Sequence, residues 1–158
     1  MVPVLTVRRA TRVDLDGLVA GNLALAKDTE GLLLDASTLR AGVLALLEER
    51  APGTYWVAEL DGVVVGQTLI TYEWSDWRNR VVWWIQSVHV VPDERRHGVF
   101  RALYAFIRGE AEAAGAGGLR LYVDTTNTRA QAVYASLGMN GEHYRVFEDM
   151  FAEPARAE

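Results

Sequence analysis

The segment that decides the fold is residues 87–104, which read SVHVVPDERRHGVFRALY. It begins as a strand rich in β-branched residues, stops at Pro92, passes through a charged loop and opens a helix after Gly98. The first N–H groups of a helix lack partners within the helix, and the helix dipole favours negative charge there. Three basic side chains add positive charge nearby: Arg95, Arg96 and Arg101. This junction therefore predicts an anion site that binds phosphate.

Upstream of this segment, hydrophobic periodicity and turn residues predict a strand, two helices and three more strands. These elements are expected at residues 4–10, from Asp14 or Asp16 to Thr29, from Asp35 or Ser37 to Glu49, and at residues 55–60, 63–74 and 81–91. The Asp61-Gly62 pair is typical of a tight hairpin turn. The last three strands should therefore form an antiparallel meander.

Downstream, apolar residues at helical spacing predict a long amphipathic helix from Gly98 to Gly115. An alternating strand is expected at residues 119–124, a helix at 128–137, and a last hairpin at 139–151 around Asn140-Gly141. The strands at either end of the unit 81–124 should be parallel neighbours, because a helix connects them. The order β-α-α-β-β-β-α-β-α-β-β predicts an α/β (α+β) fold: a mixed, mostly antiparallel twisted sheet flanked by helices, in a single domain over residues 1–158.

Composition excludes several classes of function. The chain has no cysteine, so disulfides, thiolate metal sites and a cysteine nucleophile are ruled out. Neither His89 nor His97 has a companion at metal-ligand spacing, and no metal is expected. The net charge of −5 gives no broad basic field, which argues against nucleic acid as a partner. No segment approaches the roughly 18 apolar residues of a membrane span, so no membrane partner and a cytoplasmic location are expected.

Two motifs resemble those of the GCN5-related N-acetyltransferase (GNAT) superfamily. In that family a strand leads through a proline to Arg/Gln-x-x-Gly-x-Gly/Ala, and here residues 95–100 read RRHGVF. The departure is Phe100 in place of the second Gly or Ala, which predicts a more crowded helix start. The second motif is Asn127-x-x-Ala130-x-x-x-Tyr134-x-x-x-Gly138-Met139, similar to the family's Asn-x-x-Ala-x-x-x-Tyr-x-x-x-Gly-Phe. The two motifs stand in the order and spacing that the family requires.

The resemblance implies an N-acetyltransferase that uses acetyl-CoA (coenzyme A). The acceptor amine would attack the thioester directly in a ternary complex, which agrees with the absence of cysteine. Backbone groups of the strand and loop would hold the pantetheine, thioester carbonyl and pyrophosphate. The cofactor-binding residues implied are Val88, His89, Val90, Arg95, Arg96, His97, Gly98, Val99, Phe100, Arg101, Asn127 and Tyr134. The phenol of Tyr134 would assist departure of the thiolate.

Two of these residues also have a purely structural interpretation. Asn127 is a favoured N-cap residue, a role compatible with cofactor contact. Tyr134 shares a helical stripe with Ala130, Val133 and Leu137, so it could be a core tyrosine.

The base that deprotonates the acceptor is not evident from the motifs. The strand positions where many family members carry Glu or His hold Trp84 and Gln86. The remaining acidic candidates are Glu73, Asp76, Glu30 and Asp35, of which Glu73 and Glu30 are the preferred catalytic residues. Residues 30–35 and 73–79 lie where the family builds its acceptor pocket, and their acidic and aromatic side chains suit a cationic amine.

Several alternatives stay open at this point. The acceptor is a small-molecule or peptide amine of unknown identity, and a longer acyl donor is not excluded. A non-catalytic acyl-CoA sensor or regulatory domain of the same fold is the rival function. Four tryptophans belong to the acceptor pocket, to the hairpin core or to a dimer surface: Trp74, Trp77, Trp83 and Trp84. Together with the last hairpin, they offer surfaces for a homodimer.

Overall fold

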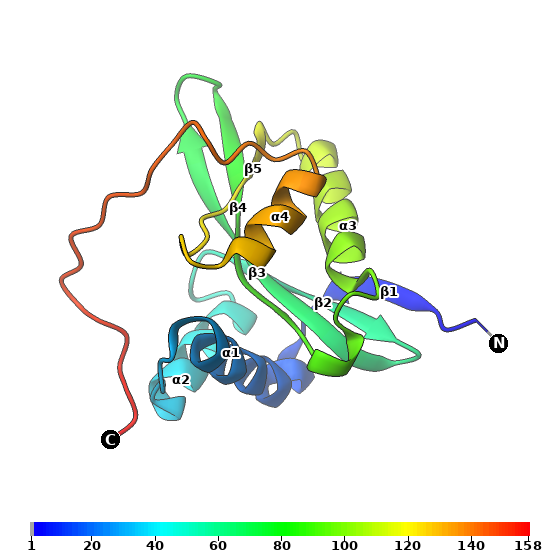
Figure 1. Cartoon of the computed structure of the whole chain (residues 1–158), viewed down its shortest axis with the longest axis vertical. Helices are drawn as coiled ribbons and strands as arrows, with labels where there is room; N and C mark the ends of the chain where they lie inside the picture. The colour runs from blue at the N-terminus through cyan, green and yellow to red at the C-terminus, as the bar shows by residue number, and fades with distance from the viewer. Residues whose placement is uncertain (1) are drawn as a thin grey trace.

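A five-stranded sheet organises the computed structural model, which describes residues 2–158 (Figure 1). The elements in chain order are β1 (Leu5–Arg9), the 3-10 turn η1 (Arg12–Asp14), α1 (Leu15–Glu30), α2 (Ala36–Leu47), β2 (Thr54–Leu60), β3 (Val63–Ser75), β4 (Arg80–Val90), the 3-10 turn η2 (Pro92–Glu94), α3 (Val99–Ala113), β5 (Gly118–Arg120) and α4 (Thr128–Ser136). The strands lie in the order β1-β2-β3-β4-β5. The first four strands pair antiparallel, and β5 pairs parallel with β4.

The helices cover the two faces of the sheet and create two hydrophobic cores. On one face α3 packs across β1 to β4, and its residues Leu103 and Ile107 are buried against Ile70 of β3. On the other face α1 and α2 bury Leu18 and Val43 against the sheet. The four-residue spacing of the buried positions in α3 is the expected stripe of an amphipathic helix. The sheet is thus covered by helices on both sides.

Local signals set the ends of these elements. The side chain of Asp35 caps α2 by accepting a hydrogen bond of 2.8 Å from the Thr38 amide. Asp61 and Gly62 both have positive φ, as a two-residue hairpin turn between β2 and β3 requires. The predicted strand and helix order is therefore confirmed from β1 to α4, with boundaries that differ by a few residues.

Two predictions about the end of the chain were wrong. The strand expected at residues 119–124 is shorter, because β5 ends at Arg120 and the chain then turns away from β4. The hairpin expected at residues 139–151 does not form: this stretch contains no strand, its first residues border a cavity described below, and the chain then bows away from the body of the molecule (Figure 1). Alternating sequence alone makes no strand when no neighbouring strand accepts its hydrogen bonds.

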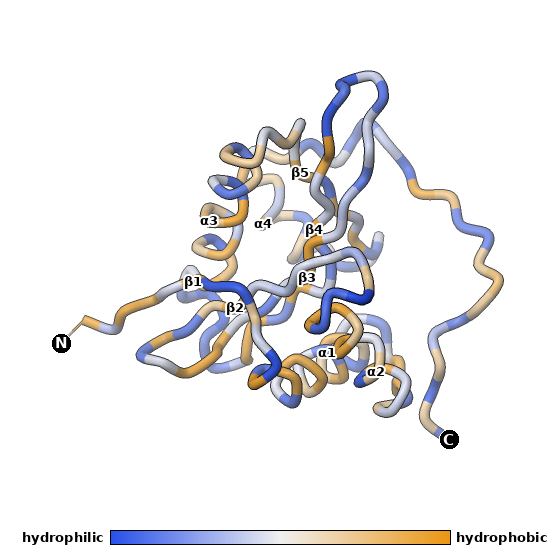
Figure 2. The backbone as a smooth tube through the Cα atoms, turned by 180° about the vertical axis from the view of Figure 1, so that it is seen from behind, coloured by the Kyte–Doolittle hydropathy of each residue, from blue (hydrophilic) through white to orange (hydrophobic). Residues whose placement is uncertain are grey.

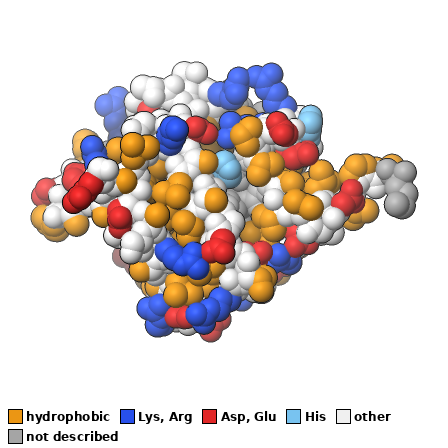
Figure 3. Space-filling view, turned by 90° about the horizontal axis from the view of Figure 1, so that it is seen from below, with side chains coloured by type: hydrophobic (Ala, Val, Ile, Leu, Met, Phe, Trp, Pro, Cys, Tyr) orange, Lys and Arg blue, Asp and Glu red, His pale blue; other side chains and the backbone are white. Residues whose placement is uncertain are grey.

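Charges of both signs mix with apolar side chains on the face that carries α1 and α2, and no basic patch dominates it (Figure 3). Among the described residues, no helix combines the length and the hydrophobicity needed to cross a bilayer.

Candidate active site

The loop before α3 presents free backbone donors. Gly98 adopts the left-handed conformation with φ of 82°, and Arg96 has φ of 66°. The first backbone hydrogen bond of the helix runs from the Ala102 amide to the Gly98 carbonyl, 3.0 Å. The amides of residues 99–101 donate no hydrogen bond within residues 2–158. They form a cluster of unsatisfied donors at the positive end of a helix dipole, which suits a phosphate.

Arg95 serves this loop as a structural support. Its Nε donates to the Val90 carbonyl at 3.0 Å, and its guanidinium lies 3.7 Å from the Asp28 carboxylate of α1. The loop is thereby fastened both to the end of β4 and to α1. Of the three arginines expected to add positive charge, Arg95 is the one whose side chain has protein partners, while Arg96 and Arg101 are exposed and form no ion pair in the described chain.

The edge of β4 that faces β5 is free over much of its length. Only Val82–Trp84 pairs with β5, and the rest of β4 has no strand partner on that side in residues 2–158. A bulge at Ser87, with φ of 51°, shifts the pairing with β3 just before Val88. The backbone of Val88, His89 and Val90 therefore lies where the two strands have separated. This is the arrangement expected for groups that bind an extended ligand.

His89 is buried within this region and contributes no charge there. Burial lowers the pKa of its imidazole, and the nearby Arg95 cation lowers it further. The imidazole is therefore neutral at pH 7.

Tyr134 contacts the start of α3 through Phe100. Their rings lie 5.7 Å apart in an edge-to-face arrangement, so the residue that departs from the family motif packs against the tyrosine. The Tyr134 hydroxyl makes no hydrogen bond within residues 2–158, and the residue lines a large cavity. Burial raises the pKa of the phenol above its ordinary value, so it stays protonated at neutral pH. A free, protonated O–H in a cavity is suited to donate a proton.

The side chain of Asn127 has the expected capping role. Its Oδ1 accepts a hydrogen bond of 3.1 Å from the Ala130 amide at the start of α4. The side-chain amide group remains available for a ligand.

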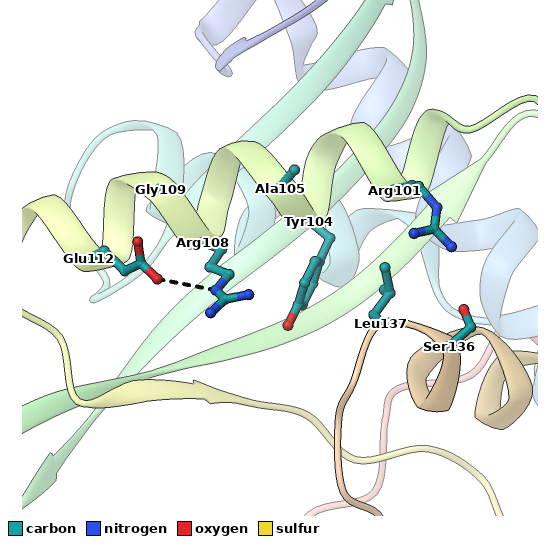
Figure 4. A pocket seen from close by; sticks show the side chains of 8 residues that line it. All are labelled: Arg101, Tyr104, Ala105, Arg108, Gly109, Glu112, Ser136 and Leu137. Carbon is teal, nitrogen blue, oxygen red and sulfur yellow. Dashed lines mark hydrogen bonds and ion pairs between the residues drawn. The ribbon is translucent and has the colours of Figure 1, made fainter.

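A groove of about 570 Å³ separates α3 from the end of α4 (Figure 4). Arg101, Tyr104 and Arg108 extend into it from α3, while Ser136 and Leu137 close it from the other side. The Arg108 guanidinium pairs with Glu112 one turn later at 3.2 Å. Arg101 at the helix start therefore carries the unpaired positive charge of this groove.

A second cavity, of about 1990 Å³, opens on the β4–β5 side of the sheet and holds most of the remaining candidates. Glu30, Glu73, Asp76 and Tyr134 all line it. Asp35 does not, and its carboxylate is engaged as the cap of α2, where hydrogen bonds from Thr38 lower its pKa. The structure brings three of the four acidic candidates to one cavity and leaves Asp35 outside it.

Glu73 is not a free carboxylate within that cavity. It forms an ion pair with Arg120 of β5, whose guanidinium also lies over the ring of Tyr144 at 5.6 Å. Sequence reasoning missed Arg120. The alternating pattern of the predicted strand could have pointed to it, because Leu119 and Leu121 lie on one face of that strand and Arg120 lies on the opposite face.

The tryptophans separate into two groups. Trp83 is buried in the core and packs edge-to-face on Tyr72 at 5.6 Å. Trp74, Trp77 and Trp84 line the large cavity, and Trp77 is 87% exposed. The hairpin-core interpretation thus holds for Trp83, whereas the other three are placed to contact a ligand. Within residues 2–158 no group of three His, Asp or Glu side chains is arranged to bind a metal.

The comparisons with known proteins agree on one family. A model described as the acetyltransferase (GNAT) family matches residues 26–139. No curated protein matches the chain significantly. A solved structure described as "a possible acetyltransferase from Clostridium difficile 630" is 41% identical, with a TM-score of 0.86 over 94% of this chain and 99% of that chain.

More distant structures share the fold. The aminoglycoside N-acetyltransferase AAC(6')-Iy in complex with CoA is 17% identical, with a TM-score of 0.77 over 96% of this chain and 98% of that one. The same enzyme with a bisubstrate analogue, CoA-S-monomethyl-acetylneamine, is 18% identical, with a TM-score of 0.75 over 94% of this chain and 99% of that one.

Proposed function

The chain belongs to the GNAT family of acetyltransferases, and from that premise we propose that it transfers an acetyl group from acetyl-CoA to a primary amine of a cationic acceptor. The observation that carries this proposal is one continuous site. It joins the separated edge of β4, the free amides at the start of α3 that follow it in the chain, and Tyr134, whose ring packs on Phe100 and whose hydroxyl has no partner in the described chain. The two complexes of AAC(6')-Iy, with CoA and with a bisubstrate analogue, support it as fold neighbours.

The residues present fit acetyl-CoA, which supplies an activated thioester. The amides of residues 96–101 would hold its pyrophosphate. The backbone of Val88, His89 and Val90 would bind the pantetheine and polarise the thioester carbonyl. The bound thioester would supply the acetyl group to the amine nitrogen with loss of the carbon–sulfur bond, and Tyr134 would donate a proton or a hydrogen bond to the departing sulfur.

The acceptor would enter the large cavity, whose lining favours positive charge. Seven carboxylates and four arginines line it, so its field attracts a cation. Trp74, Trp77 and Trp84 offer aromatic faces to an ammonium group. An alkyl amine with a pKa near 10 must lose a proton before attack, at a cost of roughly 4 kcal/mol at pH 7. Glu30 and Asp76 line the cavity without an ion pair in the described chain, which makes them better candidates for that base than Glu73.

An acyl-CoA sensor that does not transfer the group is the second candidate. Two observations favour it. Trp84 and Gln86 occupy the positions of β4 where many family members carry Glu or His, and Arg120 neutralises Glu73 by an ion pair. Release of free thiol from acetyl-CoA, measured with a panel of aminoglycosides, polyamines, amino acids and peptide amines, separates the two functions. Thiol release with any amine above the rate of hydrolysis supports the transferase. Tight acetyl-CoA binding without release for any amine would support the sensor.

The phosphate site is tested by Gly98→Val, with binding of acetyl-CoA measured by calorimetry. The substitution strains a left-handed residue and adds a side chain where a phosphate would approach the backbone closely, although nothing in the protein lies within 4 Å of the new Cβ. Gly115→Val is the matched control, because Gly115 has φ of 75°, equally open surroundings and lies after the far end of α3. We expect both variants to lose stability and only Gly98→Val to lose affinity, by about tenfold or more. Equal affinity in the two variants would show that the phosphate site is misplaced.

A further inference from the structure

Helix α4 is attached to the rest of the molecule by side-chain packing. The Gln131 side chain donates to the carbonyls of Asp124 and Thr125 at 3.2 and 3.1 Å. Asn127 caps the helix, so these hydrogen bonds stay within α4 and the loop before it. Within the described chain, residues 124–139 form no hydrogen bond or ion pair with α3 or with the sheet. No residue of α4 is fully buried, so few interactions fix where this helix lies.

Phe100 supplies a contact that joins α4 to α3. Its ring lies 5.7 Å from the ring of Tyr134, with the two planes 70° apart. α4 lies beside α3 in the two opposite views of Figures 1 and 2, yet a groove lined by Ser136 and Leu137 keeps the helices apart over part of their length (Figure 4). An edge-to-face aromatic pair is directional, because the edge and the face of a ring carry opposite partial charges. The contact with Phe100 therefore constrains both the position and the tilt of the Tyr134 ring.

The hydroxyl of Tyr134 does not hold this side chain in place. Two other tyrosines have hydroxyl partners: the Tyr55 hydroxyl accepts a hydrogen bond of 3.1 Å from the Asn22 side chain, and the Tyr72 hydroxyl lies 2.9 Å from the Thr54 hydroxyl. Tyr134 lines the large cavity, and its hydroxyl has no such partner within residues 2–158. Its orientation therefore depends on the packing of its ring.

The position of this phenol matters for the proposed chemistry. A general acid must lie within about 2.6–3.2 Å of the atom that it protonates, and a displacement of about 1 Å can lower the rate about 10²-fold. A donor that is held by ring packing is thus sensitive to the loss of the ring on which it packs.

Phe100 therefore has a role beyond that of its backbone amide. We propose that the side chain of Phe100 is a positioning residue, which holds the phenol of Tyr134 where it can donate to the departing sulfur. The inference rests on the proposed function, and in particular on donation by Tyr134. Gly and Ala, the residues of the family motif at this position, lack a side chain long enough to make this contact.

A double-mutant cycle of Phe100→Ala and Tyr134→Phe tests the coupling. Turnover is measured as kcat at saturating acetyl-CoA with the fastest-reacting amine of the thiol-release panel. We expect Phe100→Ala to lower kcat about tenfold, and the double variant to be no slower than Tyr134→Phe alone, because the hydroxyl that Phe100 positions is then absent. Independent effects would multiply to a loss of about 10³-fold. Multiplied effects, or a loss confined to the affinity for acetyl-CoA, overturn the proposal.

Phe106→Ala is the matched control. Phe106 lies further along α3, and its ring packs on Trp56 of β2 at 5.5 Å. We expect this variant to lose stability, as Phe100→Ala does, and to keep its kcat. Failure of the proposed function is distinguishable, because unchanged kcat in Tyr134→Phe contradicts donation by that residue. An impaired Tyr134→Phe together with a normal Phe100→Ala contradicts the positioning role alone.

Fluorine NMR of the protein labelled with 3-fluorotyrosine gives a readout that needs no acceptor. The chain has six tyrosines, and the resonance of Tyr134 is the one missing from Tyr134→Phe. Phe100→Ala should shift that resonance toward the position of free fluorotyrosine, because the neighbouring ring is gone and the phenol reorients. Phe106→Ala should leave it in place. A Tyr134 resonance that does not move in Phe100→Ala would show that Phe100 does not position this ring, whatever the activity of the protein.

Discussion

Tyr134 is the residue whose replacement tests the chemistry most directly. Tyr134→Phe keeps the ring packing on Phe100 and removes a hydroxyl that has no protein partner, so melting temperature and acetyl-CoA affinity should change little. Turnover should fall about 10²-fold, because proton donation to the leaving sulfur is lost.

The pH dependence gives a second readout of the same residue. Burial raises the pKa of Tyr134, so loss of activity through its ionisation should occur at a higher pH than for an ordinary phenol in the wild type and be absent from the variant. Unchanged kcat in Tyr134→Phe at saturating substrates would remove the residue from the mechanism and favour its interpretation as a packing residue.

At the scale of single residues, the sequence indicated candidate site residues but not the side chains and backbone groups that they contact. The two motifs brought Gly98, Asn127 and Tyr134 into one region because motif spacing fixes backbone position. The motifs could not predict that Arg95 bonds to Val90 and Asp28, or that Arg120 neutralises Glu73. Those contacts join residues far apart in the chain, and their geometry depends on how the elements pack.

Asp14 joins three elements and should make acid stability measurable. Its carboxylate, 8% exposed, accepts hydrogen bonds from Arg8 of β1 and from the Thr11 amide, while Arg8 also pairs with Glu59 of β2. The Arg8 guanidinium holds the pKa of Asp14 below its usual range. Asp14→Asn should therefore lower the free energy of unfolding at pH 7 by about 1–3 kcal/mol.

The sign of the pH effect follows from the lowered pKa of Asp14. The stabilisation is complete above the unfolded pKa of about 3.9 and is lost as the pH falls through the folded value. The difference between wild type and Asp14→Asn should thus shrink below about pH 4. Denaturant unfolding at several pH values measures it. Asp16→Asn, at a side chain 85% exposed and paired with Arg40, is the control; an equal loss in both variants would contradict the role assigned to Asp14.

Elements were predicted well where their signals are local. The Asp61-Gly62 turn, the Asp35 cap and the apolar stripe of α3 all specify structure within a few residues. The last hairpin failed for a different reason. Residues 139–151 alternate suitably, but a strand needs a partner, and the single chain provides none for them.

The acidic lining of the large cavity predicts how the whole molecule responds to salt. Its excess of carboxylates should attract acceptors in proportion to their charge, and ions screen this attraction as the Debye length falls from about 10 Å at 0.1 M salt to about 3 Å at 1 M. We expect kcat/KM to fall several-fold more steeply with salt for a polyamine than for a monoamine. Initial rates with the two acceptors across a salt series measure this, and parallel curves would contradict an electrostatic cavity.

The separation of β4 from β5 has a consequence for the stiffness of the protein. Beyond Trp84 the edge of β4 that faces β5 is free, so the backbone ladder between these two strands spans three residues, and side-chain packing on α3 makes the other connection to β5 and α4. Under the proposed function, a pantetheine lying in that gap would act as a missing strand and complete the ladder. Hydrogen–deuterium exchange at residues 85–90 and across α4 should then slow markedly with acetyl-CoA, while the meander β1–β3 stays unchanged. The bound cosubstrate would thus stiffen the connection between β4 and β5, and without it the protein would open more often between these two strands.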